Sequence, residues 1–588
     1  MCGIFAYLGN KNNAGEIILE GLKSLEYRGY DSWGITVKLN KKLKIEKQIG
    51  KIGEAKISLP NSTLGIGHTR WATHGGVTVQ NAHPHLDCHK EIAVIHNGII
   101  ENFTELKKEL IQKGHKFLSE TDTEVISHLI EEYLKKGGLA SSVRDTFNRL
   151  KGLSAIVVAY APSKEIIAVK NGSPLVIGKG KNELFIASDI AGILKHTNNI
   201  YFLEDQEMII LGEKVKLLKL PNGNQIEPRF QKITWNFESS EKGKFKHFYL
   251  KEIHEQPKII KNTALYSLEG TKKLANLIHK AYGTFMIACG SASYAALAGT
   301  YIFSSLAKKH VNFTIGSEFK YIEDFVKNNT LLIPISQSGE SIDVIEPVTR
   351  VKNQKGSKIA SILNVLGSTL YRISDFKLLL NAGPEKCVIA TKSFTTMVSV
   401  LLLTAYTLAK QQKQGQKLLL QASENVKKIL KKSNVLKIKQ VAKNLKNKEH
   451  IFLIGRGLSY ATALEATLKL KESTYIHAEG FAAGELKHGV IALIDKGTPC
   501  IVFAPADETY DEIISNAQEI KARGGHIIGI GPKENPVFDE FLITGDLKEA
   551  TIIPQIVTIQ LLAYHLALLK GIKDPDKPRN LAKSVTVK

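Results

Sequence analysis

The sequence predicts an α/β protein of several domains, in which a region of sheets and helices precedes a duplicated region of parallel sheets. The chain has 588 residues, which is enough for roughly three to four domains. Residues 1 to about 235 contain many short apolar segments and few helices, whereas the rest alternates apolar strands, Gly/Ser loops and helices. Three strand positions in the second region recur at offsets of 167, 170 and 168 residues. Such regular recurrence indicates a duplicated domain.

The amino-terminal region is predicted to contain sheets that are covered by helices. Segments such as EIAVIHNGII, SAIVVAY and NELFIAS have strand character, and helical runs near residues 14–26 and 122–136 interrupt them. The charged stretch that follows, NFESSEKGKFKHFYLKEIHEQP, has little apolar periodicity. We therefore expect an interdomain linker over residues 236–260, whose end begins to order.

The second region is predicted to hold two copies of a doubly wound parallel sheet, at residues 261–415 and 416–573, followed by a tail at 574–588. Continuous apolar strands that alternate with amphipathic helices favour this architecture. Ligands then bind beyond the carboxyl ends of the strands, where the Gly/Ser loops lie. The three offsets come from the pairs Phe285 and Phe452, Leu331 and Ile501, and Ile359 and Ile527.

The composition limits the partners and the compartment that we expect. Lys and Arg number 79 against 57 Asp and Glu, a net charge of +22 that attracts anionic partners or substrates. The lysines are scattered and accompany no zinc-finger spacing or aromatic-basic RNA motif, so we expect no nucleic-acid partner. Five widely spaced cysteines without a CxxC motif indicate reduced thiols in the cytoplasm and no metal site. MVSVLLLTAYTLA, which we take as the longest apolar window, is too short to span a membrane.

The second residue of the chain, Cys2, is a candidate nucleophile. Removal of Met1 would leave Cys2 with both a thiol and a free α-amino group. A terminal amine of pKa ~7.7 to 8 can accept the proton of a thiol of pKa ~8.5. On these residues alone, the alternative is a small buried cysteine at the start of a strand.

Three further motifs in this region carry polar side chains that suit the recognition of a small molecule. In HTRWATHG, Arg70 has the planar fork that binds a carboxylate through two hydrogen bonds. In HNGIIEN, the amide of Asn97 and the backbone N–H of Gly98 suit a developing oxyanion. In ETDTEV, Asp122 precedes a helix, and its alternative role is a helix N-cap. The histidines of the first motif, taken alone, are more typical of structural positions.

Together Cys2, RWATHG, HNGIIEN and SETDTE resemble, in order and spacing, the N-terminal-nucleophile glutamine amidotransferases. The resemblance implies an αββα domain over residues 2–235, in which Cys2 attacks the amide carbon of glutamine, releases ammonia and leaves a glutamyl thioester. It implies further roles that are assigned by motif: Arg70 and Asp122 hold the α-carboxylate and α-amino group, Thr73 and His74 line the pocket, Asn97 and Gly98 form the oxyanion hole, and Trp71 gates the ammonia path.

Two motifs of the duplicated region suit a sugar phosphate and proton transfer. The loop SQSGES places hydroxyls and backbone N–H groups at a helix start, which favours a phosphate, although a serine-rich helix cap is the alternative. In the second copy, Glu465, Lys469 and Glu472 share one helix face. A solvated ion-pair ladder is the alternative there. The ladder continues into a Gly/Ala-rich turn with further ionisable residues, which favours acid–base chemistry.

The tail DPDKPRNLAKSVTVK, taken alone, is typical of a disordered terminus. However, PRNLAKSVTV, SQSGES, the ALE…LKLKE helix and GELKHG resemble the isomerase half of the isomerizing glutamine–fructose-6-phosphate aminotransferases, which has two sugar isomerase (SIS) domains. The resemblance covers essentially the whole chain. It implies that Lys583 forms a Schiff base with C2 of fructose 6-phosphate, that Glu472 moves a proton between C1 and C2 with help from Lys469, and that His488 assists ring opening from the partner subunit of a homodimer. Lys583 must then lose its proton near pH 7, as a buried or cation-flanked lysine can.

The same resemblance implies sugar-phosphate contacts from Ser291, Ser336, Gln337, Ser338, Ser341 and Val388, products D-glucosamine 6-phosphate and L-glutamate, and no metal or organic cofactor. Two departures from the family pattern stand out. ACGSAS replaces ACGTS, so Ala292 lacks a hydroxyl, and VIATKSF places Ala390 where a serine touches the sugar. A lost buried hydrogen bond costs about 0.5 to 1.5 kcal/mol. Either the sugar binds more weakly or it differs, so the same chemistry on another ketose phosphate stays open. A non-catalytic sugar-phosphate regulator is a further alternative, because SIS domains also serve regulators.

Overall fold

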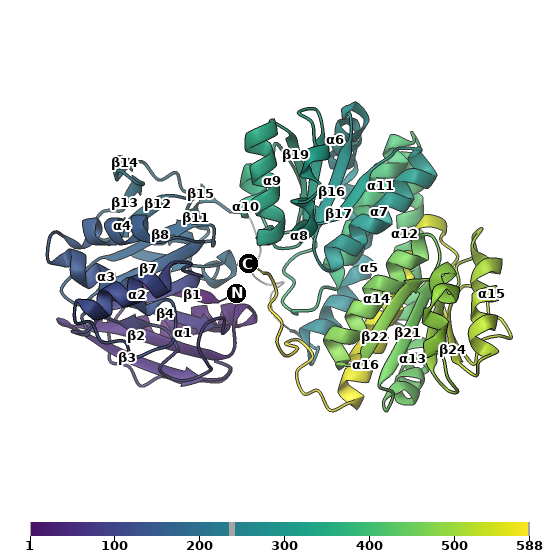
Figure 1. Ribbon diagram of the computed structural model, residues 1–588, viewed down its shortest axis with the longest axis horizontal. Coiled ribbons are helices and arrows are strands. Elements are labelled where there is room, and N and C mark those ends of the chain that lie inside the picture. The colour runs from purple at the N-terminus through teal and green to yellow at the C-terminus, as the bar shows by residue number, and fades with distance from the viewer. Residues whose placement is uncertain (1, 234–241, 586–588) are drawn as a thin grey trace. The chain divides into compact units, whose positions relative to one another are not determined.

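The computed structural model describes residues 2–233 and 242–585, which divide into two compact units (Figure 1). The first unit comprises Met1–Glu238 and Ala582–Lys588, and the second comprises Ser239–Leu581. Lys583 therefore belongs to the same unit as Cys2. Met1 and residues 236–241 of the expected linker lie outside the described residues.

Two antiparallel sheets form the centre of the first unit, with strand orders β15-β11-β9-β10-β1-β4-β2-β3 and β14-β13-β12-β8-β7-β6-β5. The strands of the first sheet are β1 Gly3–Gly9, β2 Ser32–Leu39, β3 Lys42–Ile49, β4 Leu64–Arg70, β9 Val176–Lys179, β10 Glu183–Ala187, β11 Asn199–Phe202 and β15 Gln231–Lys232. Those of the second are β5 His85–Leu86, β6 Ile92–Gly98, β7 Ser154–Tyr160, β8 Ile166–Asn171, β12 Glu207–Leu211, β13 Lys216–Lys219 and β14 Asn224–Ile226.

The two sheets pack face to face, and helices cover their outer faces. Alternate strand residues, such as Ile4 and Ile95, meet in the core between the sheets. Their neighbours point outward, so Val94 packs with Ile126 beneath the helices of the second sheet. The helices are α1 Ala14–Leu25 against the first sheet, and α2 Phe103–Gln112, α3 Glu124–Leu134 and α4 Leu139–Arg149 against the second. The prediction of an αββα domain is confirmed.

The second unit contains two five-stranded parallel sheets with the same strand order, which confirms the predicted duplication. The orders are β17-β16-β18-β19-β20 and β22-β21-β23-β24-β25, and the three aligned residue pairs lie on β16 and β21, β18 and β23, and β19 and β24. The strands are β16 Thr284–Ala288, β17 Asn312–Ile315, β18 Leu331–Ser336, β19 Lys358–Leu363, β20 Phe376–Leu379, β21 His450–Gly455, β22 His477–Ala482, β23 Pro499–Phe503, β24 His526–Gly531 and β25 Glu540–Ile543.

Helices cover both faces of the parallel sheets, as a doubly wound fold requires. Figure 1 shows α9 on one face of the first sheet and α7 and α11 on the other. The helices of the first copy are α5 Phe248–Tyr266, α6 Leu268–Lys280, α7 Ser291–Ala307, α8 Gly316–Phe319, α9 Ile342–Lys355, α10 Thr369–Ile373 and α11 Lys392–Leu408. Those that follow are α12 Gln412–Ile429, α13 Lys432–Leu445, α14 Leu458–Thr474, α15 Tyr510–Lys521 and α16 Ile552–Leu569.

Part of the segment expected to be a linker is instead a core helix. Residues 248–260 form most of α5, in which Tyr249, Ile253 and Ile260 are fully buried. The carboxylate of Asp576 accepts the N–H groups of Phe248 (2.9 Å) and Tyr249 (2.7 Å) at the start of the helix. The linker therefore does not extend over residues 248–260, where the expected ordering of its end takes the form of a buried helix. Its apolar face was not recognised because charged residues dominate the local composition.

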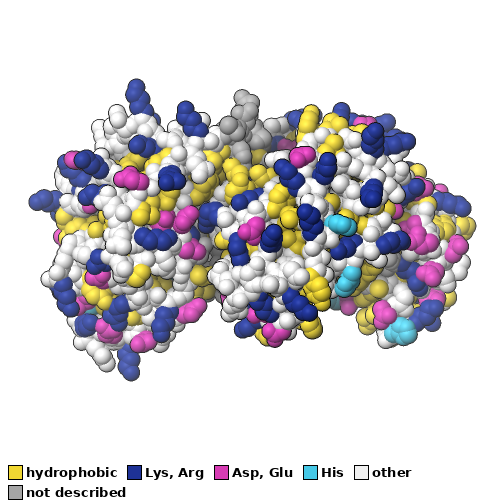
Figure 2. Space-filling model, turned by 90° about the horizontal axis from the view of Figure 1, so that it is seen from above, with side chains coloured by type: hydrophobic (Ala, Val, Ile, Leu, Met, Phe, Trp, Pro, Cys, Tyr) yellow, Lys and Arg dark blue, Asp and Glu magenta, His cyan; other side chains and the backbone are white. Residues whose placement is uncertain are grey.

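Among the described residues, the helix that is long and apolar enough to cross a membrane is not the segment that the sequence indicated. Lys548–Leu569 is long and apolar enough to cross a membrane by length and composition, whereas the segment around MVSVLLLTAYTLA forms the shorter helix α11. The structure buries 83% of the apolar window of Lys548–Leu569, as expected of a core helix. On the face of the molecule seen in Figure 2, Lys and Arg side chains alternate with acidic, apolar and uncharged surface.

Candidate active sites

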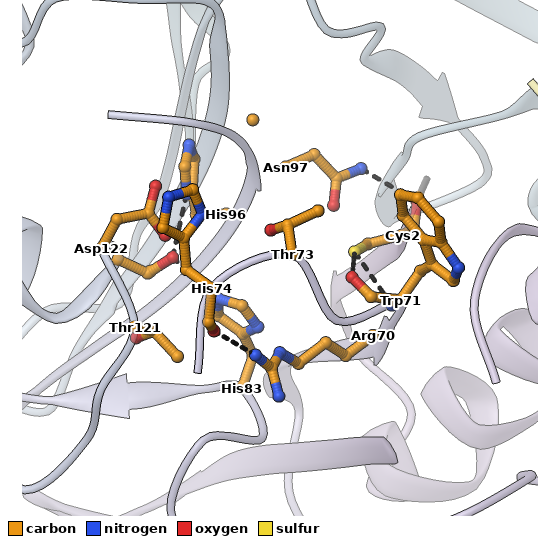
Figure 3. Close-up of a pocket in the computed structure, with 12 residues that line it drawn as sticks. Cys2, Arg70, Trp71, Thr73, His74, His83, His96, Asn97, Thr121 and Asp122 are labelled. Atoms are coloured by element: carbon orange, nitrogen blue, oxygen red, sulfur yellow. Dashed lines mark hydrogen bonds between the residues drawn. The ribbon is translucent and has the colours of Figure 1, made fainter. Parts of the chain in front are cut away.

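The thiol of Cys2 lies directly before β1, a central strand of the first sheet, and faces a pocket (Figure 3). The backbone N–H of Trp71 donates to Cys2 Sγ at 3.2 Å, and Asn97 Nδ2 donates to the carbonyl oxygen of Cys2 at 3.0 Å. Burial raises the pKa of the Cys2 thiol. A base is therefore needed to make it a nucleophile.

A buried histidine fixes the orientation of the Asn97 amide. His68 Nε2 lies 3.0 Å from Asn97 Oδ1 and 3.1 Å from the carbonyl oxygen of His96. Both neighbours are acceptors, so Nε2 carries the proton, and burial lowers the pKa of His68 to about 3, which keeps the ring neutral. Because Oδ1 of Asn97 is held by His68, its Nδ2 faces Cys2.

The residue after Asn97 must be glycine. Gly98 has a φ of 141°, and a Cβ at this position would lie 2.0 Å from the carbonyl oxygen of Leu153. A side chain would therefore displace the strand end and its backbone N–H. The combination of Asn97 and Gly98 at the end of β6 thus has a steric reason as well as a chemical one.

Arg70 and Asp122 lie in the same pocket and are anchored by the backbone. The Arg70 guanidinium donates to the carbonyl oxygens of Gly75 and Gly76 (each 3.0 Å) and to that of His74. The Asp122 carboxylate accepts the N–H of Ile100 at 2.8 Å. Asp122 is therefore not the N-cap of α3, because the helix starts after Thr123 and the carboxylate binds another segment.

The pocket gathers every glutamine-site residue that the motifs indicated and four others. The predicted residues that line it are Cys2, Arg70, Trp71, Thr73, His74, Asn97, Gly98 and Asp122, and the additional ones are His83, His96, Thr121 and Thr123. His83 Nε2 and His96 Nδ1 lie 3.0 and 2.9 Å from Thr123 Oγ1. Thr121 and Thr123 flank Asp122 in ETDTEV. Their position on either side of a predicted site residue was the feature of the sequence that could have indicated them.

In the second unit, a buried lysine joins the two copies of the parallel domain. Lys469 Nζ on α14 lies 2.7 Å from Glu472 Oε2 and 3.5 Å from Glu465 Oε1, and it donates to Ser291 Oγ at 3.0 Å. Ser291 is the first residue of α7 in the other copy. Lys469 and Glu465 are fully buried, so the interpretation of a solvated ladder is wrong.

The charges of this cluster depend on one another. Burial raises the pKa of Glu465 to about 7, although the nearby Lys469 opposes that rise. Burial also disfavours the charge on Lys469, but Glu465 and Glu472 outweigh it and hold the lysine pKa above its usual value. Lys469 is therefore a permanent cation that positions Glu472, whose side chain keeps 19% of its surface exposed.

The serine loop follows β18 and leads into α9. Ser336 Oγ accepts the N–H of Gly339 at 2.9 Å, and Ser338 Oγ accepts that of Glu340 at 3.1 Å. Ser341 is the residue before α9, and its hydroxyl lies 3.5 Å from Ser336 Oγ rather than on a helix N–H. The carbonyl oxygen of Gln337 accepts the N–H of Asn364 at 3.2 Å. The loop therefore places hydroxyls together at a helix amino terminus, where an anion is favoured.

Known proteins resemble the whole chain. It is 44% identical over 606 residues to the glutamine–fructose-6-phosphate aminotransferase (isomerizing) of Thermococcus kodakarensis, and 45% identical over 603 residues to that of Pyrococcus horikoshii. In both cases the match covers 100% of each protein. The chain belongs to the isomerizing glutamine–fructose-6-phosphate aminotransferase family.

Family models and a solved structure agree with this membership. A model described as a glutamine amidotransferase domain matches residues 68–195, and one described as a SIS domain matches residues 277–406 and 444–570. The C-terminal domain of the glucosamine-fructose-6-phosphate aminotransferase from Francisella tularensis has a TM-score of 0.52 and 34% identity. The match covers 56% of this chain and 98% of that domain.

The aminotransferase resemblance also indicated His488, Lys583 and Val388. His488 ends a short 3-10 helix, Ala483–His488, and is exposed. Lys583 is half-buried and belongs to the first unit. Val388 is 8% exposed, and its N–H donates to the carbonyl oxygen of Asp576 at 2.9 Å.

Proposed function

We propose that the protein transfers the amide nitrogen of L-glutamine to D-fructose 6-phosphate and isomerises the product to D-glucosamine 6-phosphate, with release of L-glutamate (EC 2.6.1.16), the first step of hexosamine synthesis. The observation that carries the proposal is the full-length similarity to proteins whose names state this reaction. The division that we propose is a glutaminase domain at 2–235, SIS domains at 261–415 and 416–573, and a catalytic tail at 574–588. The matched SIS ranges fall within the two proposed domains.

In the glutaminase half, Cys2 Sγ would attack the side-chain amide carbon of glutamine after its own α-amino group takes the thiol proton. The oxyanion that forms would accept hydrogen bonds from Asn97 Nδ2 and the N–H of Gly98. Its collapse expels ammonia, which carries the proton away, and water then hydrolyses the thioester to glutamate. The pocket supports substrate roles for Arg70 and Asp122, because both are charged and lie on its wall.

In the isomerase half, Lys583 Nζ would attack the C2 carbonyl of open-chain fructose 6-phosphate and form an imine with loss of water. Ammonia then displaces the lysine, and Glu472 moves a proton from C1 to C2. The 2.7 Å contact with Lys469 supports this role, because it holds the carboxylate in place. The sugar phosphate would be held by Ser291, Ser336, Gln337, Ser338, Ser341 and Val388.

We further propose a cytoplasmic homodimer with an internal ammonia path. The exposure of His488 supports a role in the sugar site of a second copy. Trp71, which lines the pocket beside Cys2, would gate the path. A Trp71→Ala enzyme should hydrolyse glutamine without matching hexosamine formation, and fully retained coupling would contradict the gate. The free cysteines support a reducing compartment.

The decisive experiment compares glutamine and ammonia as nitrogen donors for the wild type and Cys2→Ala. Loss of only the glutamine-driven product supports two separate centres, and loss of both donors, or of neither, contradicts the proposal. The mass of the mature protein shows whether Met1 is removed, since a retained Met1 would block the proposed amine base. Cys289→Ser is the matched control, because that cysteine lies in the other unit.

A different ketose phosphate is the second candidate, and Ala292 and Ala390 favour it because each lacks a hydroxyl that the family pattern supplies. Kinetic constants for several ketose 6-phosphates would decide between the sugars. A non-catalytic sugar-phosphate regulator is the remaining alternative. Turnover with any sugar phosphate would exclude the regulator.

A further inference from the structure

A second polar cluster lies in the first unit, outside the pocket of Cys2. It consists of Cys88, His115, His128 and Glu131, whose sulfur, nitrogen and oxygen atoms all lie within 4.8 Å of one another. Cys88 lies in the turn between β5 and β6, His115 in the connection between α2 and α3, and the other two on α3. The fold thus brings four possible metal ligands together from three segments.

Four of the six distances between the ligand atoms match the edges of a tetrahedron around a zinc ion. Cys88 Sγ lies 3.6 Å from His115 Nδ1 and 3.6 Å from His128 Nδ1. Glu131 Oε2 lies 3.1 Å from His115 Nδ1 and 3.2 Å from His128 Nδ1. Zinc–sulfur bonds of about 2.3 Å and zinc–nitrogen or zinc–oxygen bonds of about 2.0 to 2.1 Å give tetrahedral edges of about 3.6 and 3.3 Å.

Each histidine presents Nδ1 to the centre of the cluster and Nε2 to an outer carboxylate. His115 Nε2 lies 2.9 Å from Glu132 Oε1, and His128 Nε2 lies 3.6 Å from Glu124 Oε1. Glu124 is itself fixed by the backbone N–H of Ser119 at 2.7 Å. Outer carboxylates of this kind orient metal-bound imidazoles and make the ring nitrogen that binds the metal more basic.

We propose that Cys88 Sγ, His115 Nδ1, His128 Nδ1 and Glu131 Oε2 bind one Zn²⁺ ion. Binding releases the thiol proton to solvent, and the thiolate and carboxylate neutralise the charge of the ion. Four protein ligands complete a tetrahedral sphere, so the site is structural rather than catalytic. This replaces the expectation of no metal, which rested on the absence of CxxC, and it holds whichever sugar the enzyme uses.

The site has a local consequence for the glutamine pocket. The helix α3 that carries His128 and Glu131 follows directly on the loop with Thr121, Asp122 and Thr123, which lines that pocket. Binding of a metal ties this helix to the β5–β6 turn and to the α2–α3 connection. His128 is 1% exposed, whereas Cys88 is exposed, so the ion enters from the cysteine side.

The test uses the full-length protein, stripped with a chelator and titrated with Co²⁺ and then with Zn²⁺. We expect one equivalent of Co²⁺ per chain, with the sulfur-to-cobalt charge-transfer band and the intense visible bands of tetrahedral Co²⁺, both removed by Zn²⁺. Cys88→Ser should lose the charge-transfer band, and His115→Ala should weaken binding at least tenfold. Cys88 is exposed, so its serine variant should fold; circular dichroism checks this.

Matched controls separate this site from other thiols and histidines. Cys2→Ala, Cys289→Ser and His450→Ala should retain the full cobalt spectrum, because none of these residues belongs to the cluster. Zn²⁺ should raise the melting temperature of the wild type but not of a folded Cys88→Ser variant. An octahedral spectrum, equal metal content in wild type and Cys88→Ser, or loss of the band in Cys2→Ala would overturn the proposal.

Discussion

Replacing His68 by leucine is expected to lower glutamine hydrolysis and leave the ammonia-dependent reaction intact. His68 is fully buried, and its Nε2–H is shared by Asn97 Oδ1 (3.0 Å) and the carbonyl oxygen of His96 (3.1 Å). Without that donor, the hydrogen bond from Asn97 Nδ2 to the carbonyl oxygen of Cys2 (3.0 Å) is left alone to oppose a turn of the amide that points its oxygen toward Cys2. The proposed oxyanion hole would then lose one of its two donors.

The expected loss of stability follows from the two acceptors that lose their hydrogen-bond donor. A buried acceptor left unsatisfied costs about 1 to 3 kcal/mol, so the variant should lose roughly 2 to 4 kcal/mol of stability, allowing for partial relaxation. Removal of one oxyanion donor lowers kcat by about 10²- to 10³-fold, which is the upper limit here. Because the residues proposed to bind glutamine, Arg70 and Asp122, are unchanged, the KM for glutamine should change little.

The assay measures glutamate release over a range of glutamine concentrations, hexosamine formation from ammonia, and thermal unfolding. His68→Gln is the conservative variant, since its amide N–H can replace the lost donor and should restore part of kcat. His196→Leu is the matched control, because this half-buried histidine stacks on Phe185 at 4.7 Å and lies outside the pocket lining. A folded His68→Leu protein with wild-type kcat, or with an equal loss of both reactions, would refute the reasoning.

Three further predictions follow from single positions. Gly98→Ala should abolish glutamate release and lower the melting temperature, because its Cβ would lie 2.0 Å from Leu153 O; wild-type values for both would contradict this. The pKa of Glu465 rises from 4.5 to about 7 on folding, so its contribution to stability is present below pH 4.5 and lost as pH rises through 7, on the order of 3 kcal/mol. Urea unfolding should give a free energy of unfolding that differs less between pH 5 and pH 8 for Glu465→Gln than for the wild type. An equal difference in the two proteins would contradict this prediction. Burial holds the pKa of His68 at about 3 and that of His83 well below its usual value, so acidification from pH 6.5 toward 3 should destabilise the first unit by about 1.4 kcal/mol per pH unit for each histidine. Domain-resolved calorimetry at pH 7 and 5 measures this, and an unchanged melting temperature would contradict it.

Periodicity in the sequence was sufficient to predict the two parallel-sheet copies, whereas the αββα arrangement of the first unit came from the motif resemblance. Near-equal offsets between Phe285 and Phe452 and between the other two pairs indicated two copies, and the two parallel sheets share one strand order. The start of α5 was missed because its buried residues, such as Tyr249 and Ile253, are separated by charged letters that dominate local composition. Only packing against the rest of the second unit identifies it as core.

Short motifs predicted only those residues of the candidate sites that lie within the motifs themselves. Motif spacing placed Arg70, Asn97 and Asp122 with Cys2, but the role of His68 depends on a contact 29 residues along the chain, which no local pattern contains. The metal-ligand cluster was missed for the same reason, since Cys88 and His128 are 40 residues apart. Local spacing reveals ligands on one turn or helix, whereas these sites are assembled by the packing of separate segments.

The buried cluster on α14 shows why one of its two carboxylates suits proton transfer to a substrate. Glu465 is fully buried, and its pKa of about 7 reflects that burial, so it can touch neither water nor sugar directly. Glu472 has 19% of its side chain exposed and receives the short 2.7 Å contact from Lys469. The Lys469 cation interacts with both carboxylates, and it lies closer to Glu472 than to Glu465. A proton on Glu465 therefore leaves more of the positive field of Lys469 for Glu472. In the proposed mechanism, Glu465 would be a positioning residue and Glu472 the group that moves the proton.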